Sequence, residues 1–160
     1  MAKKNKKILV TGGAGYVGST FIRDALADDY HVRCIDLLVY GGQSLTCFIN
    51  HPNFEFVHGD IRDRETILNC LDGINIVVHL AAIVGDKPCQ AAPKSTYQIN
   101  YLGTKLLADC SKESNVNKFI FASTCSNYGV SDSNIYATEE SSLNPGAACK
   151  CMAVELEEKH

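Results

Sequence analysis

A glycine-rich stretch placed directly between a strand pattern and a helix pattern constrains this chain more than any other feature. The stretch, TGGAGYVG, runs from Thr11 to Gly18. It ends the apolar run Lys7–Thr11, which is typical of a buried strand, and opens Tyr16–Ala27, where apolar residues recur at helical spacing. A strand, a tight turn and a helix in this order predict that the free N–H groups of the helix amino end face a phosphate.

The spacing of the glycines, G-x-x-G-x-x-G, assigns each of them a different task. Gly12 allows a tight turn, Gly15 lets the backbone approach a pyrophosphate, and Gly18 lets the helix pack closely on the strand. A glycine pattern alone is weak evidence for a nucleotide site, but the strand before it and the helix after it are the required context. The candidate loop residues are Gly12, Gly15, Tyr16, Val17 and Gly18.

A carboxylate ends the second expected strand, Val32–Asp36. Asp36 follows the loop by about twenty residues, where dinucleotide-binding folds place an acidic residue that accepts hydrogen bonds from the adenosine ribose. Because this carboxylate would repel a 2′-phosphate, the sequence predicts NAD rather than NADP. Arg33 precedes the strand end and is not expected to select NADP. The alternative for Asp36 is a loop carboxylate that caps a turn.

The rest of the chain continues the alternation of strands and helices. Further strands are expected at Asn53–His58, Ile74–Leu80 and Lys118–Ser123, and further helices at Arg62–Leu71, Lys94–Asn115 and Ala147–His160. The long helix Lys94–Asn115 is expected to carry Leu102, Leu106, Leu107 and Cys110 on one face. Apolar strands separated by helices predict an α/β fold with a doubly wound parallel sheet covered on both faces. Ligands bind such sheets at the carboxyl ends of the strands. The length of 160 residues suits one domain.

Composition and charge exclude several classes of protein. The net charge of −3 argues against nucleic acid as the main partner, because phosphate backbones require a concentrated cationic face. No run of about 18 apolar residues is present, so no membrane span is expected. The eight scattered cysteines and the lack of a signal-peptide pattern favour reduced thiols in a cytoplasmic protein. The pair Cys149 and Cys151 has no further ligands at zinc spacing, so no metal is expected.

Several motifs in order resemble the extended short-chain dehydrogenase/reductase family, in particular its NAD-dependent sugar-nucleotide epimerases and dehydratases. Besides the glycine loop and Asp36, they are GDIRD at Gly59–Asp63, HLAA at His79–Ala82, INYLGT around Asn100, and STCSNYG at Ser123–Gly129. The resemblance runs from Ile8 to about Pro145. It implies a Rossmann-type NAD-binding domain over residues 1–160, a nucleotide-sugar substrate and, as is common in the family, a homodimer formed through the long helices.

The resemblance implies cofactor contacts at two of these motifs. Asp60 would meet the amino group of the adenine, and the Ile61 side chain would meet the adenine face. Leu80, Ala81 and Ala82 would line the ribose–pyrophosphate path with small side chains. The alternative for Ala81 and Ala82 is that a tight sheet requires small residues there in any case.

The resemblance also implies roles around the expected active site. Asn100 would brace the backbone of the long helix near that site. Ser123 would lie beside the cofactor, and the Thr124 hydroxyl would form a hydrogen bond with the reacting sugar oxygen. Alternatively, Ser123 and Thr124 cap the fifth strand. His79 is expected to be a hydrogen-bonded core histidine rather than a catalyst.

The family's Tyr-x-x-x-Lys pair is not found in its expected place. In the usual register after Pro145, the tyrosine position holds Cys149 and the lysine position holds Ala153. A register that keeps Lys150 as the lysine places Gly146 at the tyrosine, so neither register supplies the pair. Cys149 is therefore a doubtful catalytic candidate, because its thiol is shorter than a phenol by most of a ring and Ala153 brings no charge to lower its pKa. One literal match, Tyr101 and Lys105, precedes the Ser/Thr strand and is interpreted as coincidence.

The chain ends where the family's last strands and substrate-binding region would follow, so we expect it to be truncated before them. Three hypotheses stay open. The chain is a truncated or altered NAD-dependent epimerase or dehydratase whose catalysis is crippled, a non-catalytic NAD-binding sensor or scaffold, or a fragment that associates with other chains.

Overall fold

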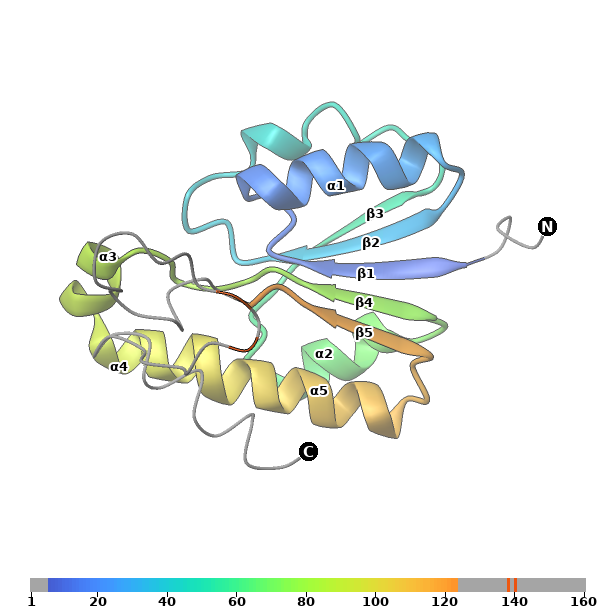
Figure 1. Cartoon of the computed structure of the whole chain (residues 1–160). Helices are drawn as coiled ribbons and strands as arrows, with labels where there is room; N and C mark the ends of the chain where they lie inside the picture. The colour runs from blue at the N-terminus through green and yellow to red at the C-terminus, as the bar shows by residue number, and fades with distance from the viewer. Residues whose placement is uncertain (1–5, 124–137, 139, 141–160) are drawn as a thin grey trace.

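The computed structural model describes residues 6–123, 138 and 140, and its strands form one parallel sheet (Figure 1). The spatial order is β3-β2-β1-β4-β5, which is the doubly wound arrangement predicted from the sequence. The strands are β1 (Lys7–Thr11), β2 (His31–Asp36), β3 (Phe54–His58), β4 (Ile76–His79) and β5 (Lys118–Phe121).

The helices cover both faces of this sheet (Figure 1). Helix α1 lies on one face, and helices α2 and α5 lie on the other. The helices are α1 (Tyr16–Ala27), α2 (Arg64–Leu71), α3 (Asp86–Ala91), α4 (Pro93–Thr96) and α5 (Thr104–Glu113). A 3₁₀ turn, η1, spans Gln43–Leu45, and a π-helical segment, η2, spans Tyr97–Gly103 and joins α4 to α5 without a break.

Two apolar clusters form the core, one on each face of β1. Because side chains alternate along a strand, Ile8 and Val10 pack toward α1, whereas Leu9 packs toward α2 and α5. From the second face, Leu107 and Cys110 of α5 complete the cluster around Leu9. β1 is thus buried on both sides, and its carboxyl end is held firmly where the glycine loop begins.

The bounds of the predicted strands and helices within the described residues agree with the structure to within two residues. β1 and α1 match residue for residue. Helix α2 begins at Arg64, two residues later than expected, because Asp63 caps it and accepts a hydrogen bond from Glu65 N at 3.2 Å. Helix α3 was not predicted, because six residues that include a proline carry no readable apolar period.

The apolar face predicted for the long helix is only partly buried. Leu107 and Cys110 are buried, whereas Leu102 is 44% exposed. Leu102 and Leu106 line one open pocket with Arg62, so they share a face whose amino-terminal part stays exposed.

Some predictions lie outside the residues that the structure describes. They are Thr124, Cys149, Ala153 and the helix expected at Ala147–His160. The cysteines within the described part are free; Cys34, Cys70, Cys89 and Cys110 are buried and Cys47 is exposed. None of the helices in residues 6–123 is both long enough and apolar enough to cross a bilayer.

Candidate dinucleotide-binding site

The glycine loop begins with a turn that only glycine can make at that position. Gly12 has a φ of +72°, and its N–H donates to Ile35 O at 3.0 Å. A Cβ on Gly12 would lie 2.7 Å from the Ala81 backbone, well inside van der Waals contact. This close approach joins the loop to the segment that follows β4.

The two later glycines differ in what surrounds them. A Cβ on Gly18 would lie 2.4 Å from Gly12 O, so Gly18 is required for packing of α1 on the loop. Gly15 has ordinary extended torsions, and among the described residues its Cβ would meet only Gly12 O, at 3.2 Å. The space over Gly15 is therefore open at the amino end of α1. Next to it, Tyr16 and Val17 are 90% and 62% exposed.

The middle of the loop sits over a buried thiol. A Cβ on Gly13 would lie 2.3 Å from Cys34 Sγ. Burial and, to a smaller extent, the Asp36 charge raise the pKa of the Cys34 thiol to about 12. The loop thus rests on a neutral, packed sulfur atom.

Asp36 fixes the loop and the turn after β2 together. Its Oδ2 accepts from Ala14 N at 2.9 Å, and its Oδ1 accepts from Leu38 N at 2.8 Å. The turn-capping alternative is therefore realised, yet each carboxylate oxygen keeps a second lone pair for a further donor. Ser44 Oγ donates to Ala14 O at 2.7 Å, so both the N–H and the carbonyl of Ala14 are hydrogen-bonded. Ser44 was not predicted from the sequence, because it lies in an irregular stretch with no periodic signal.

Arg33 is engaged elsewhere. Its Nε donates to Glu55 Oε2 at 2.7 Å, and its Nη1 donates to Cys70 O at 2.8 Å and to Asp72 O at 3.1 Å. The guanidinium therefore satisfies free carbonyls at the carboxyl end of α2. This placement agrees with the expectation that Arg33 does not select the cofactor.

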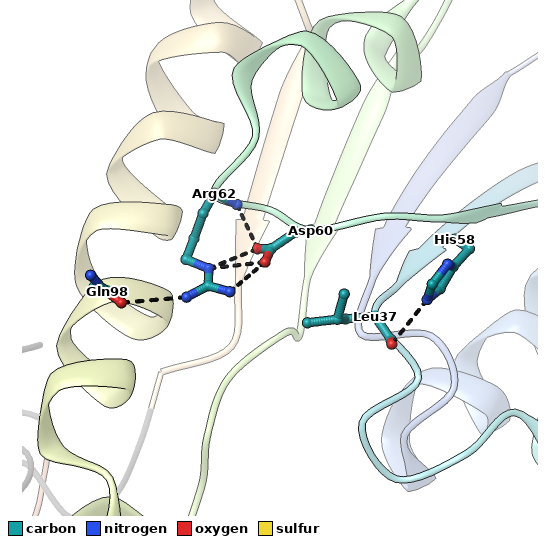
Figure 2. A network of polar contacts seen from close by, with 5 residues as sticks. All are labelled: Leu37, His58, Asp60, Arg62 and Gln98. Atoms are coloured by element: carbon teal, nitrogen blue, oxygen red, sulfur yellow. Dashed lines mark hydrogen bonds and ion pairs between the residues drawn. The ribbon is translucent and has the colours of Figure 1, made fainter.

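A polar network fixes Asp60 at the carboxyl end of β3 (Figure 2). Arg62 Nε lies 3.0 Å from both carboxylate oxygens of Asp60, and Arg62 Nη2 also donates to Oδ2. The hydrogen bonds from Arg62 hold the pKa of Asp60 below its usual value, so the group is ionised. Arg62 Nη1 also reaches Gln98 Oε1 at 3.4 Å and so connects this turn to the long helix.

Ile61 is buried in the protein interior, more than a role in ligand contact alone would require. It is 5% exposed, and its side chain packs against Gly103, where a Cβ would lie 3.0 Å from Ile61 Cδ1. The expected contact between Ile61 and an adenine face stays a prediction. Arg62, which belongs to the same GDIRD motif, was not assigned a role from the sequence.

Asn100 braces a different backbone from the one expected. Its Oδ1 accepts from Ile83 N at 2.8 Å, and its Nδ2 donates to Ile83 O at 2.8 Å. The amide therefore holds the segment after β4, not the backbone of the long helix. The sequence could not supply this partner because Ile83 lies on another element. The π-helical turn of η2 presents the amide, and such turns are frequent at functional sites.

The segment Leu80–Ala82 runs beside the end of β1. Leu80 N donates to Thr11 O at 3.1 Å, and the N–H groups of Leu80 and Ala81 each lie 3.3 Å from Thr11 Oγ1. Together with the glycine loop, Asp36 and Asp60, this segment lies at the carboxyl edge of the sheet. The structure thus brings the predicted cofactor residues of four strands to one edge.

His79 is the core histidine that the sequence predicted. It is 1% exposed and lies between two hydroxyls, with Nδ1 2.6 Å from Thr11 Oγ1 and Nε2 2.8 Å from Thr104 Oγ1. Its ring packs on Phe119 and Phe121. Burial lowers the pKa of His79 to about 4, so the ring is neutral near pH 7.

We expect His79 to make stability depend on pH between about 6.5 and 4. The ring of the unfolded chain takes up a proton near pH 6.5, whereas the folded ring resists protonation until about pH 4. In this window the unfolded state binds more protons, so the free energy of unfolding falls as the pH falls. The full loss is roughly 3 kcal/mol.

Urea titrations at several pH values measure this loss of the free energy of unfolding. His79→Phe should flatten the pH slope, and an equal slope in the variant would contradict the assignment.

The remaining candidate site residues follow β5 in the sequence. Ser123 is exposed just beyond β5, and Thr124 and Cys149 lie outside the described residues. The Tyr101 ring packs on Tyr97, with 5.2 Å between ring centroids. Within residues 6–123, 138 and 140, no three His, Cys, Asp or Glu side chains are grouped so that they could hold a metal ion.

Comparison with known sequences assigns this arrangement to a family. Residues 8–159 match the profile of the NAD dependent epimerase/dehydratase family. The chain belongs to this family. The resemblance of the ordered motifs to the NAD-dependent epimerases and dehydratases predicted the same membership.

Individual relatives agree with this membership. The low-salt glycan biosynthesis protein Agl12 of Haloferax volcanii is 34% identical over 152 residues, which are 91% of this chain and 49% of the relative. The crystal structure of DesIV, a dTDP-glucose 4,6-dehydratase from Streptomyces venezuelae with NAD and TYD bound, superposes with a TM-score of 0.80 and 36% identity. The match covers 87% of this chain and 45% of that one.

A second solved structure matches almost the whole chain. It is the UDP-N-acetylglucosamine 4-epimerase from Methanobrevibacter ruminantium M1, with a TM-score of 0.83 and 30% identity over 97% of this chain and 50% of that one. The chain of this family member therefore spans about half the length of the relatives that it matches.

Proposed function

We propose that this chain binds NAD at the carboxyl edge of the sheet, as the cofactor-binding part of an epimerase or dehydratase that acts on a nucleotide sugar. The observation that carries the proposal is the open space over Gly15 at the amino end of α1, with the Asp36 carboxylate fixed beside it. Membership of an NAD dependent family and relatives with bound NAD support it.

The residues at this edge fit the parts of a dinucleotide. The N–H groups at the amino end of α1 would meet the pyrophosphate over Gly15. The remaining lone pairs of Asp36 would accept hydrogen bonds from the ribose hydroxyls. The ionised Asp60 carboxylate would accept a hydrogen bond from the adenine amino group. Leu80–Ala82 would line the path between them. Bound NAD supplies the acceptor for a hydride taken from a sugar carbon.

We also propose that the chain as written does not catalyse at a useful rate. A phenol with a pKa of about 10 needs a cationic neighbour to act as a base near neutral pH. Cys149 and Ala153 stand where that phenol and its lysine neighbour would be. Thr124 can orient a hydroxyl but cannot take its proton. This lack of a base favours, as a second candidate function, an NAD-binding sensor or scaffold.

The choice of cofactor tests the binding proposal. We expect NAD to bind more tightly than NADP in fluorescence titrations, because Asp36 would repel a 2′-phosphate. Asp36→Ala should weaken the binding of NAD by ~1–3 kcal/mol, the range for unpairing hydrogen bonds to a charged group. Ser44→Ala is the matched control, since it releases the carbonyl of the residue whose N–H Asp36 holds but keeps the carboxylate. Equal affinity for both dinucleotides would move the ribose contact away from Asp36.

Turnover tests the catalytic proposal. A panel of nucleotide sugars should give NAD reduction and epimerisation at least ~100-fold slower than a full-length relative, since general-base help contributes about 10²–10⁴-fold. Family-like turnover would show a base that we have not identified, with Cys149 first in line. If only these parts are missing, Cys149→Tyr with Ala153→Lys should restore activity in a chain extended by the carboxy-terminal half of a relative.

A further inference from the structure

A continuous series of buried hydrogen bonds passes through His79. At one end, Thr104 Oγ1 donates to Asn100 O at 2.6 Å, one helical turn earlier. At the other end, Thr11 Oγ1 receives the N–H groups of Leu80 and Ala81. Thr11, His79, Asn100 and Thr104 are all buried.

These contacts determine where the proton of the ring lies. The single hydroxyl proton of Thr104 goes to Asn100 O, because a carbonyl can only accept. Nε2 of His79 must therefore donate to Thr104 Oγ1, and the neutral ring leaves Nδ1 bare. Thr11 then donates its hydroxyl proton to Nδ1 and accepts from the two backbone N–H groups. Every hydrogen bond in the series has one donor and one acceptor.

The series ties together three segments of the cofactor edge. Thr11 is the last residue of β1, directly before the glycine turn. Leu80 and Ala81 follow β4, and their path continues to Ile83, which the Asn100 amide holds from both sides. Thr104 and Asn100 belong to the junction of η2 and α5. A shift of the His79 ring would therefore release these segments from one another.

We propose that His79, as its neutral Nε2–H tautomer, is a positioning residue that holds Leu80–Ile83 against the glycine loop and so sets the affinity for the dinucleotide without touching it. Packing alone does not require a histidine, because the ring lies against Phe119 and Phe121 and another aromatic ring would pack there too. Only a ring with one donor and one acceptor satisfies both buried hydroxyls. This inference rests on the proposed binding of NAD.

The test uses Thr104, because the position offers an isosteric pair. Thr104→Val keeps the shape but leaves Nε2–H without an acceptor, and it should raise the Kd for NAD by about tenfold, the scale of one buried hydrogen bond. Thr104→Ser keeps the oxygen and should stay within about twofold of the wild type. In the double variant with His79→Phe, the Thr104→Val change should weaken binding no further. Circular dichroism checks that each variant is folded.

A second measurement reads the ring without any ligand. Nitrogen NMR of the free chain should show one histidine with a protonated Nε2 and a bare Nδ1, and Thr104→Val should change these signals. A proton on Nδ1 at neutral pH would overturn the proposed direction of the series. If His79→Phe does not fold, the Thr104 pair and the NMR signals still decide the question.

The two proposals fail in different ways. If the wild-type chain binds no NAD, the proposed function falls and this inference falls with it. If the wild type binds NAD and folded Thr104→Val binds it equally well, only the positioning role of His79 is overturned.

Discussion

Gly15→Val is expected to abolish NAD binding while the fold survives. The branched side chain would occupy the space where the pyrophosphate is proposed to lie, over the amino end of α1. The protein itself offers little resistance, because the torsions of Gly15 are ordinary and the nearest described atom, Gly12 O, would lie 3.2 Å from the new Cβ. Fluorescence titration measures NAD binding, and urea unfolding measures stability.

A graded control strengthens this test. Gly15→Ala adds only one carbon atom, so it should lower the affinity for NAD less than Gly15→Val does. Both variants should keep most of the free energy of unfolding of the wild type. Unchanged binding in a folded Gly15→Val protein would place the dinucleotide elsewhere.

Gly12→Ala is expected to have the largest effect on stability, a loss of roughly 2–5 kcal/mol. A left-handed backbone costs a non-glycine residue about 1–2 kcal/mol, and Gly12 has a φ of +72°. Overpacking costs about 1–3 kcal/mol more, because the new Cβ would lie 2.7 Å from backbone atoms of Ala81. Hydrogen bonds restrain both backbones, since Gly12 N donates to Ile35 O and Ala81 N donates to Thr11 Oγ1.

Gly73 separates these two costs. It has a φ of +70°, but the nearest atom to its Cβ would be Lys7 Nζ at 3.7 Å. Gly73→Ala should therefore lose only the backbone part, about 1–2 kcal/mol. Equal losses in Gly73→Ala and Gly12→Ala, measured by urea unfolding, would show that the approach to Ala81 is not tight.

The sequence predicted those parts of the fold whose signals are local. β1 and α1 were placed to the residue, because an apolar run, a glycine turn and a helical period follow one another directly. Asp36 was found because the strand that ends there fixes its distance from the loop. Asp60 and Asn100 were predicted as site residues only from the resemblance to the family's motifs, because no local pattern distinguishes them.

The parts that the sequence did not predict depend on contacts between distant segments. The Asn100 amide holds Ile83 because η2 crosses the segment after β4. The exposure of Leu102 was not predicted, because apolar spacing shows which residues share a helix face but not which segment covers them. Thr104 was overlooked, although its place four residues after Asn100 puts both on one helix face. Ser44 comes to the loop only when the turn after β2 folds back over Ala14.

The thiol beneath Gly13 has a consequence for chemical labelling. Oxidants and alkylating reagents attack the thiolate, and a pKa of about 12 leaves almost none of it at Cys34 near neutral pH. The sulfur also has no room for an added group, since a single carbon on Gly13 would already overlap it at 2.3 Å. The glycine loop therefore shields Cys34 in the native state. A reagent that modifies Cys34 reports the moments when β2 and the loop separate, so the rate of modification measures how often this edge of the sheet opens.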